Sequence, residues 1–143
     1  MAHAETMLKM MVVEDNPLIR DLVRHGVNRL QREQGANIEL FETADGATAW
    51  SRILENEFDL VLVDLYIPVL DGLELIKRIR ENDQTHGIPI LGMSASYTDA
   101  EDRCLGAGAD RFIQKPLRAE ELLLMLRALL HLQAPKSRKT SFP

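Results

Sequence analysis

The sequence predicts an α/β protein whose parallel sheet of five strands is covered by helices on both faces. Short apolar runs alternate along the chain with segments in which apolar residues recur at helical spacing, and five such pairs can be found. Residues 60–63, Leu-Val-Leu-Val, show the pattern most clearly, because a continuous apolar run bounded by turn residues is typical of a strand buried on both sides. A length of 143 residues suits one such domain with an ordinary core.

The same pattern places each strand and helix. We expect strands at residues 7–13, 38–41, 59–63, 88–93 and 111–113. Helical spacing predicts the helices that follow them at residues 18–30, 44–56, 72–80, 99–105 and 118–132. Asn16 and Pro17 suit the N-cap and the first position of the first helix. Asp71 suits the N-cap of the third helix, and Gly106 and Gly108 end the fourth.

The apolar faces of two helices can be predicted from the spacing. In the second helix, the residues expected to face the core are Ala47, Trp50 and Leu54. In the final helix, the expected core stripe is Leu122, Leu126 and Leu129. A second apolar stripe beside it is formed by Leu124, Met125, Ala128 and Leu132. Because a helix that covers a sheet needs only one apolar face, we interpret the second stripe either as a surface for another protein or as a support for the segment at Pro135.

Composition and charge indicate a globular domain without a nucleic-acid surface. Apolar residues make up 45% of the chain and charged residues 27%, which are the proportions of a folded protein. The net charge is −5, and three basic residues lie in the last ten positions, so the preceding part is more acidic still. An acidic domain argues against direct binding of nucleic acid. We interpret residues 7–133 as one domain and residues 134–143 as a tail or the start of a linker.

Membrane spans, signal peptides and disulfides are not expected. No apolar run approaches the roughly 18 residues of a membrane span, and residues 1–6 lack the basic and apolar segments of a signal peptide. The single cysteine, Cys104, excludes an internal disulfide and fits a reducing compartment. We therefore expect a cytoplasmic location.

The residues that carry chemistry lie at the carboxyl ends of the predicted strands. Glu14 and Asp15 follow the first strand, Asp64 the third and Ser94 the fourth, while Lys115 lies just beyond the fifth. Because the carboxyl ends of parallel strands meet at one edge of a sheet, we expect these side chains to share a pocket. Three clustered carboxylates would repel one another without a cation among them, and oxygen ligands with no nearby His or Cys favour Mg²⁺.

Asp64 is open to three interpretations, as a nucleophile, a metal ligand or a helix cap. The cap is the weakest, because Asp71 stands closer to the start of the next helix. A hydroxyl and an ammonium opposite a metal would stabilise the charge on the oxygens of a transferred phosphoryl group. Asp64 is then the natural acceptor and would form an acyl phosphate.

Taken together, these motifs resemble the receiver domain of response regulators in two-component signalling, including the single-domain chemotaxis regulators. The family pattern has an acidic pair after the first strand, an Asp-to-Gly loop after the third, a hydroxyl after the fourth and Lys-Pro after the fifth. The matching segments here are Val12-Val13-Glu14-Asp15-Asn16, Asp64-Leu65-Tyr66-Ile67-Pro68-Val69-Leu70-Asp71-Gly72, Met93-Ser94-Ala95 and Lys115-Pro116. Residues 106–110, Gly-Ala-Gly-Ala-Asp, are a further family habit, and the resemblance covers roughly residues 7–132.

The resemblance implies the flavodoxin-like strand order 2-1-3-4-5 and a role for each matched residue. Asp64 would be phosphorylated by a histidine kinase or a histidine phosphotransfer protein, with Ser94 and Lys115 contacting the phosphoryl group. Mg²⁺ would be bound by Asp15, Asp64 and the backbone carbonyl of Tyr66, with Glu14 binding it either directly or through water. Phe112 would change rotamer as Ser94 moves, and the Lys115–Pro116 peptide would be cis. Such a domain is a signalling module rather than an enzyme, since it promotes only its own phosphorylation and dephosphorylation.

Two residues depart from the family pattern. Glu14 stands where Asp is commoner, and Tyr66 is larger than the residue that many members have there, which leaves the lifetime of the phosphoryl group open. Receivers commonly dock through the fourth helix, fifth strand and fifth helix, so the resemblance makes this face the candidate for a homodimer or an effector. The sequence does not specify the kinase, the signal or the output, nor whether the chain is a stand-alone receiver or part of a longer regulator or hybrid kinase.

Other functions compete with this interpretation. A phosphatase or phosphomutase would use the same nucleophile, but it usually needs a second acid at the position of Tyr66. A flavodoxin shares the fold class, but Glu14 and Asp15 would repel its phosphate. A degenerate receiver would serve only for protein docking. Considered one at a time, Lys115 could also be an ordinary surface lysine, and Phe112 could be an ordinary core residue without a switching role.

Overall fold

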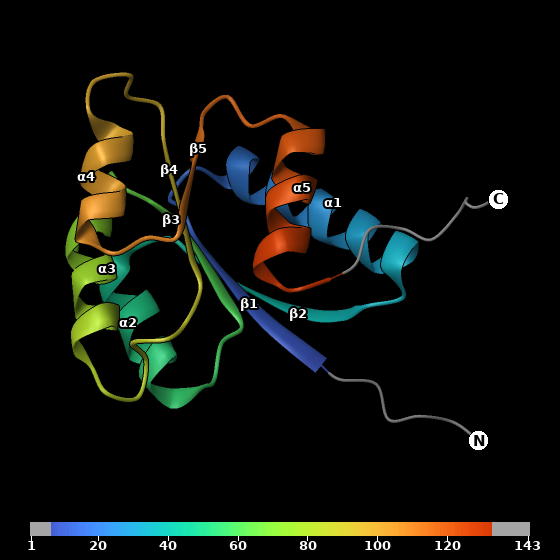
Figure 1. Ribbon diagram of the computed structural model, residues 1–143, viewed down its shortest axis with the longest axis horizontal. Helices are drawn as coiled ribbons and strands as arrows, with labels where there is room; N and C mark the ends of the chain where they lie inside the picture. Colours follow the sequence, from blue (N-terminus) through green and yellow to red (C-terminus); the bar gives the residue numbers. More distant parts are fainter. Residues whose placement is uncertain (1–6, 133–143) are drawn as a thin grey trace, which may run out of the picture.

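A parallel sheet of five strands runs through the middle of the molecule (Figure 1). The computed structural model describes residues 7–132. Its strands are β1 (Met7–Val13), β2 (Asn37–Thr43), β3 (Leu60–Asp64), β4 (Ile90–Ser94) and β5 (Arg111–Gln114). Their order is β2-β1-β3-β4-β5, and all neighbouring strands are parallel, which confirms the predicted fold class and strand order.

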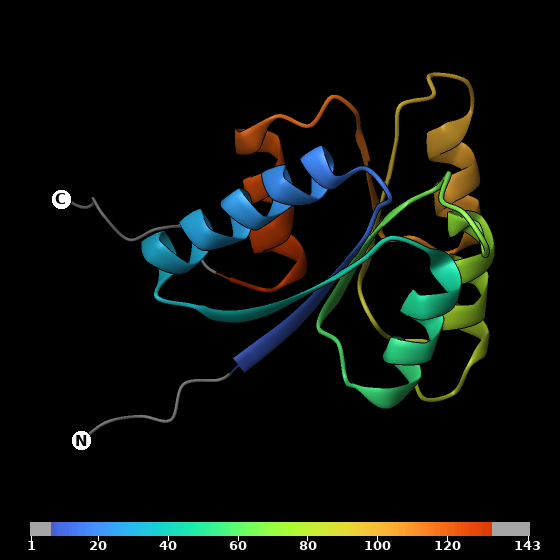
Figure 2. The same ribbon diagram turned by 180° about the vertical axis from the view of Figure 1, so that it is seen from behind.

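Helices cover both faces of the sheet, as the alternating pattern predicts (Figures 1 and 2). One face carries α1 (Pro17–Gln34) and α5 (Ala119–Leu129), which contact each other. The other face carries α2 (Gly46–Glu55), α3 (Gly72–Glu81) and α4 (Ala100–Ala107), with α3 in contact with both of its neighbours. Each helix returns the chain to the same end of the sheet, so the carboxyl ends of all the strands lie along one edge.

The first helix begins and ends at local signals. The side chain of Asn16 accepts a hydrogen bond from the amide of Leu18 (2.9 Å), and Pro17 takes the first helical position, as predicted. The helix runs beyond the predicted residue 30 and ends at Gly35, whose φ of 67° lies in the left-handed region. A glycine adopts this conformation without the steric cost that a Cβ would add, which is why the helix ends there.

The boundaries of the central strands place two polar residues inside the sheet. Both β3 and β4 begin later than predicted, and their last residues are Asp64 and Ser94. After β3, the chain turns back into α3, where Asp71 accepts a hydrogen bond from the amide of Glu74 (2.9 Å) and so acts as the predicted N-cap. Strand pairing rather than a loop therefore holds the backbone of Asp64 and Ser94.

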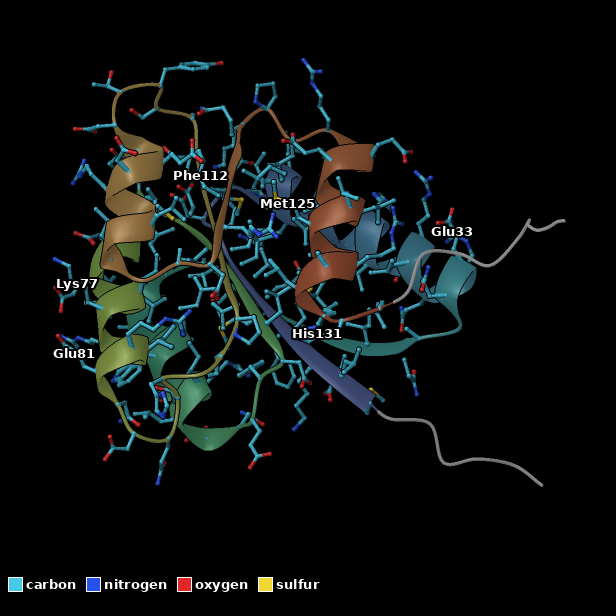
Figure 3. The ribbon with its side chains drawn as sticks, viewed as in Figure 1. Glu33, Lys77, Glu81, Phe112, Met125 and His131 are labelled. Carbon is cyan, nitrogen blue, oxygen red and sulfur yellow. The ribbon has the colours of Figure 1, made fainter. Side chains whose placement is uncertain are left out.

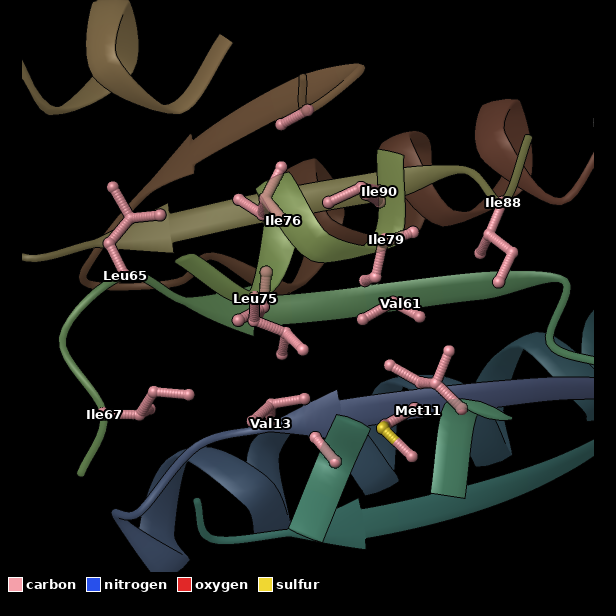
Figure 4. Packing of buried hydrophobic residues seen from close by; sticks show 14 of the residues in the cluster. Met11, Val13, Val61, Leu65, Ile67, Leu75, Ile76, Ile79, Ile88 and Ile90 are labelled. Atoms are coloured by element: carbon pink, nitrogen blue, oxygen red, sulfur yellow. The ribbon is translucent and has the colours of Figure 1, made fainter. Parts of the chain in front are cut away.

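The sheet divides the core into two clusters. All residues of β3 are buried, because the strand has a covered neighbour on each side and helices on both faces. The cluster toward α2, α3 and α4 includes Met11, Val13, Val61, Leu75, Ile76, Ile79 and Ile90 (Figure 4). The cluster toward α1 and α5 includes Met10, Val12, Val27, Leu60, Leu62, Leu122 and Leu126. Alternation along β1 and β3 thus supplies both clusters.

The predicted inward face of α2 is wrong. The buried residues are Gly46, Ala49 and Ile53, whereas Ala47 and Leu54 are exposed and Trp50 is half-buried. The helix starts at Gly46, after the Asp45 cap. Gly46 is itself buried and lies so close to the backbone carbonyl of Leu70 that a Cβ would run into it. A hydropathy pattern gives no weight to a glycine that is buried for its lack of a side chain, so the predicted face was rotated.

The two predicted stripes of α5 are only partly confirmed. Leu122 and Leu126 are buried as expected, but Leu129 is half-buried, and the stripe is completed by Leu123 and Leu130. The second stripe is divided, because Leu124 and Ala128 are exposed while Met125 and Leu132 pack partly against the core. The core therefore uses part of the surplus apolar surface, and Leu124, which is 61% exposed, is its largest unused part.

Three further predictions concern the whole chain. Among residues 7–132, no helix is long and apolar enough to cross a membrane. Cys104 is a buried free cysteine, and burial raises the pKa of its thiol to about 11. The predicted tail at residues 134–143 lies outside the described residues.

We predict opposite effects for the same substitution at two glycines. A Cβ at Gly46 would collide with the carbonyl of Leu70, which follows the left-handed Val69 (φ 72°), so Gly46→Ala should lower the free energy of unfolding by about 1–3 kcal/mol. A Cβ at Gly106 in α4 would meet nothing within 4 Å, so Gly106→Ala should raise it by about 0.5–1 kcal/mol through helix propensity. Urea unfolding measures both. Equal stability of the two variants would show that the loop at residues 66–71 yields without cost.

Candidate functional site

Asp64 stands at the carboxyl end of the central strand and is 5% exposed. Its Oδ1 atom accepts a hydrogen bond from the amide of Tyr66 (3.0 Å), and its Oδ2 atom accepts one from Lys115 Nζ (2.7 Å). Behind it, a Cβ at Gly72 would run into the carbonyl of Asp64 and the Cα of Leu65. The start of α3 is therefore in backbone contact with the end of β3, which fixes the position of the carboxylate from behind.

The acidic pair follows β1, which lies next to β3 in the sheet. Glu14 is 1% exposed, whereas Asp15 is exposed. The Oε2 atom of Glu14 accepts a hydrogen bond from the amide of Asn16 (3.1 Å), and its Oε1 atom accepts one from Lys115 Nζ (2.6 Å). Glu14 is thus a buried carboxylate with a partner at each oxygen, and Asp15 presents its carboxylate at the surface beside it.

The three carboxylates form a group that suits a divalent cation. Glu14, Asp15 and Asp64 each offer one oxygen, and these oxygens all lie within 4.8 Å of one another. Within residues 7–132, no His or Cys belongs to this group, and hard oxygen ligands are those that Mg²⁺ and similar cations prefer. The donor set therefore fits the metal that the sequence predicts.

Lys115 supplies the positive charge of the site. Its ammonium bridges Glu14 and Asp64, and the Lys115–Pro116 peptide is cis, as expected. Burial works against the charged form, but hydrogen bonds to Asp64 and Glu14 raise the pKa of Lys115 above its ordinary value. Burial also raises the pKa of Glu14 above its ordinary value, despite the bond from Lys115. The ammonium is consequently charged at neutral pH and offsets part of the acidic charge.

Ser94 ends β4 beside Asp64's strand and is fully buried. Its Oγ accepts a hydrogen bond from the amide of Ser96 (2.9 Å), and its carbonyl oxygen accepts from the amide of Lys115 (2.9 Å) and from Gln114 Nε2 (2.9 Å). Phe112 lies opposite Gly92 on the neighbouring strand β5 and is half-buried against the α3–α4 side of the core. Hydrogen bonds from residues 114 and 115 therefore fix the backbone of Ser94, and its hydroxyl stabilises the loop that follows β4.

Tyr66 lies two residues after Asp64 and is 53% exposed. Its hydroxyl oxygen is 3.5 Å from Nη1 of Arg103 in α4. The side chain thus extends along the surface toward α4, while its amide remains bonded to the Asp64 carboxylate. The predicted role of its carbonyl as a metal ligand stays a prediction.

The structure gathers Glu14, Asp15, Asp64 and Lys115 into one cluster, as predicted from the strand ends. The hydroxyl of Ser94, which was predicted to share this pocket, accepts a hydrogen bond from the Ser96 amide instead of contacting these side chains. The structure adds contacts that the sequence analysis missed, among them those of Arg20, whose Nη1 donates to the Glu14 carbonyl (2.8 Å), and of Gln114. Both residues use backbone carbonyls as partners, which no residue pattern identifies.

Comparison with known proteins agrees with this geometry. Residues 10–127 match the family described as the response regulator receiver domain. The response regulator ArlR of Staphylococcus saprophyticus is 36% identical over 133 residues, which are 92% of this chain and 56% of ArlR. This chain thus spans about half the length of the curated relatives that it matches.

This chain also aligns with solved structures over nearly their whole length. The chemotaxis response regulator CheY4 of Vibrio cholerae has a TM-score of 0.75 and 29% identity, covering 87% of this chain and 99% of its own. The receiver domain of the sensor histidine kinase PA1611 of Pseudomonas aeruginosa has a TM-score of 0.77 and 25% identity, covering 88% and 99%. That structure contains a magnesium ion coordinated in its active site cleft.

Proposed function

The chain belongs to the response regulator receiver domain family, and we propose that its Asp64 accepts a phosphoryl group from a histidine kinase or a histidine phosphotransfer protein. The observation that carries the proposal is the ammonium of Lys115, which bridges the buried carboxylates of Asp64 and Glu14 at the carboxyl edge of the sheet. A cationic group already lies where a phosphoryl group on Asp64 would add negative charge.

Mg²⁺ is the cofactor that we propose for this step. The groups that would hold it are Glu14, Asp15, Asp64 and the backbone carbonyl of Tyr66. When bound, it would offset the charge of the carboxylates and of the phosphoryl oxygens, which is the usual contribution of a metal to phosphoryl transfer. The magnesium ion in the PA1611 receiver domain supports this choice.

The chain's own residues supply the rest of the chemistry. A carboxylate oxygen of Asp64 forms a bond to phosphorus as the bond from phosphorus to the donor imidazole nitrogen breaks, and that nitrogen keeps the electron pair. Lys115 contacts and neutralises the phosphoryl oxygens. The hydroxyl of Ser94 leaves the Ser96 amide and donates to the same group, and Phe112 moves inward with it, so that the new charge at Asp64 alters the surface of β4 and β5.

We predict that Asp64→Asn abolishes phosphorylation. Wild type incubated with acetyl phosphate and Mg²⁺ should gain one phosphoryl group by intact mass, and a chelator should prevent the gain. Asp71→Asn is the matched control, because Asn caps a helix as well as Asp and this residue only caps α3. Labelling retained in Asp64→Asn, or undiminished by the chelator, would contradict the assignment.

We predict that the ring of Tyr66 slows loss of the phosphoryl group by hindering the approach of water to phosphorus. Tyr66→Ala and Tyr66→Asn should lose the group about tenfold faster, which corresponds to ~1.4 kcal/mol of barrier. Tyr66→Phe keeps the ring and removes only the contact with Arg103, so it should decay like wild type. Decay in Tyr66→Ala that is no faster than wild type would show that the ring lies off the path of water.

We also propose the face of α4, β5 and α5 as the surface for a second copy or an effector. Leu105 of α4 is 41% exposed, and Figure 3 shows Phe112 and Met125 on either side of β5. Because Phe112 belongs to this face, its inward movement would change the surface that a partner meets.

We predict that a beryllofluoride phosphoryl mimic increases dimerisation of wild type, measured by light scattering. Met125→Glu should remove the increase, because it adds a charge at an apolar contact. Leu54→Glu is the control, since Leu54 is a 44% exposed apolar residue on α2, away from this face. Circular dichroism checks that both variants fold. A monomer in all samples would rule out the homodimer.

A further inference from the structure

Arg20 lies in the first turn of α1 and reaches back to the loop that carries the acidic pair. Its Nη1 donates a hydrogen bond to the backbone carbonyl of Glu14 (2.8 Å), and its Nε is 3.5 Å from Glu42 Oε1 in β2. The side chain is 22% exposed, so water competes for these contacts less than at an open surface. Arg20 thereby ties the β1–α1 loop both to the helix that follows it and to the neighbouring strand.

As a result, every polar atom of Glu14 has a partner. Its amide donates to the carbonyl of Thr43 (3.0 Å), its carbonyl accepts from Arg20, and both carboxylate oxygens are bonded as described above. The carbonyl of Glu14 and the amide of Asp15 belong to one planar peptide unit. The hydrogen bond from Arg20 therefore fixes the plane from which the side chain of Asp15 starts.

We propose that Arg20 is a positioning residue for binding of the divalent cation. A guanidinium has no lone pair for a metal, so Arg20 acts through the Glu14–Asp15 peptide and not as a ligand. With that peptide held, the exposed carboxylate of Asp15 meets the cation without first losing the freedom of its backbone. This inference rests on the proposed function, because it concerns the metal step of the same site.

The hydrogen bond of Arg20 should raise the affinity for Mg²⁺, whereas its positive charge should lower that affinity, because a cation beside the carboxylates repels another cation. Arg24 separates the two effects. It lies one turn further along α1 and binds the same Glu42 through two hydrogen bonds (2.8 and 3.1 Å), with Asp21 as a further partner (2.8 Å). Arg24 makes no hydrogen bond to Glu14. Its removal therefore breaks the ion pair with Glu42 but leaves the β1–α1 loop attached to Arg20.

The test measures Mg²⁺ binding directly, without a phosphodonor, by nuclear magnetic resonance titration of wild type, Arg20→Met, Arg20→Lys and Arg24→Met. Arg20→Met should raise the Kd for Mg²⁺ about tenfold, a usual effect of losing a residue that orients metal ligands. Arg20→Lys should raise it by a smaller factor, because one ammonium cannot hold both partners of the guanidinium. Arg24→Met should stay within about twofold of wild type. In metal-free protein, the amide resonance of Asp15 should move in Arg20→Met and not in Arg24→Met.

The outcomes separate this inference from the proposed function. If wild type binds no Mg²⁺, both the metal step and this inference fail. If wild type binds Mg²⁺ and Arg20→Met binds it equally well, this inference alone is overturned. Tighter binding by Arg20→Met would also overturn it, since repulsion would then outweigh positioning. Thermal unfolding in metal-free buffer checks folding. Should Arg20→Met fail to fold, a Kd for Arg20→Lys equal to that of wild type would overturn the inference.

Discussion

The site depends on the enforced closeness of the carboxylates of Glu14 and Asp64. Neither can move away, because each belongs to or directly follows a strand in the middle of a parallel sheet, and both are nearly fully buried. Bringing two buried carboxylates together is unfavourable, and the single ammonium of Lys115 compensates for it by bonding to both. The exposed Asp15 adds a further negative charge, so the balance of the cluster favours cations. The strand positions that bring these acids together thus also create the site's need for positive charge.

The shape of the site is largely a property of the backbone. Gly72 allows the start of α3 to touch the carbonyl of Asp64, and Gly46 allows α2 to rest on the turn at Leu70. Main-chain amides hold one oxygen each of Glu14 and Asp64, and the carbonyl of Ser94 is bonded twice. The side chains that carry chemistry are therefore held in place by backbone groups as well as by one another.

The order and class of the elements were predictable from the sequence, because burial on both faces gives β3 an unbroken apolar run and capping residues such as Asp71 mark the helices. The cluster of acids with Lys115 was predictable for a related reason, since parallel strands end at one edge. The inward face of α2 was not, because Gly46 is buried for its lack of a side chain. The contact between Arg20 and Glu14 was also not predictable, because the Arg20 side chain reaches back from α1 to a backbone carbonyl, and a backbone carbonyl leaves no signal in the sequence.

The edge opposite the site has a different character. Its connections, at residues 35–36, 56–59, 82–89 and 108–110, contain none of the residues proposed to hold the metal or the phosphoryl group, whereas the loops after β1, β3, β4 and β5 carry or adjoin those residues. Insertions and substitutions accumulate where they disturb neither packing nor chemistry. Three of these connections are not free to vary, because they contain the buried residues Phe58, Thr85, Ile88 and Ala109. Gly35, at the end of α1, is exposed, so an engineer who wishes to graft a tag or a sensor onto this domain should choose the turn after α1.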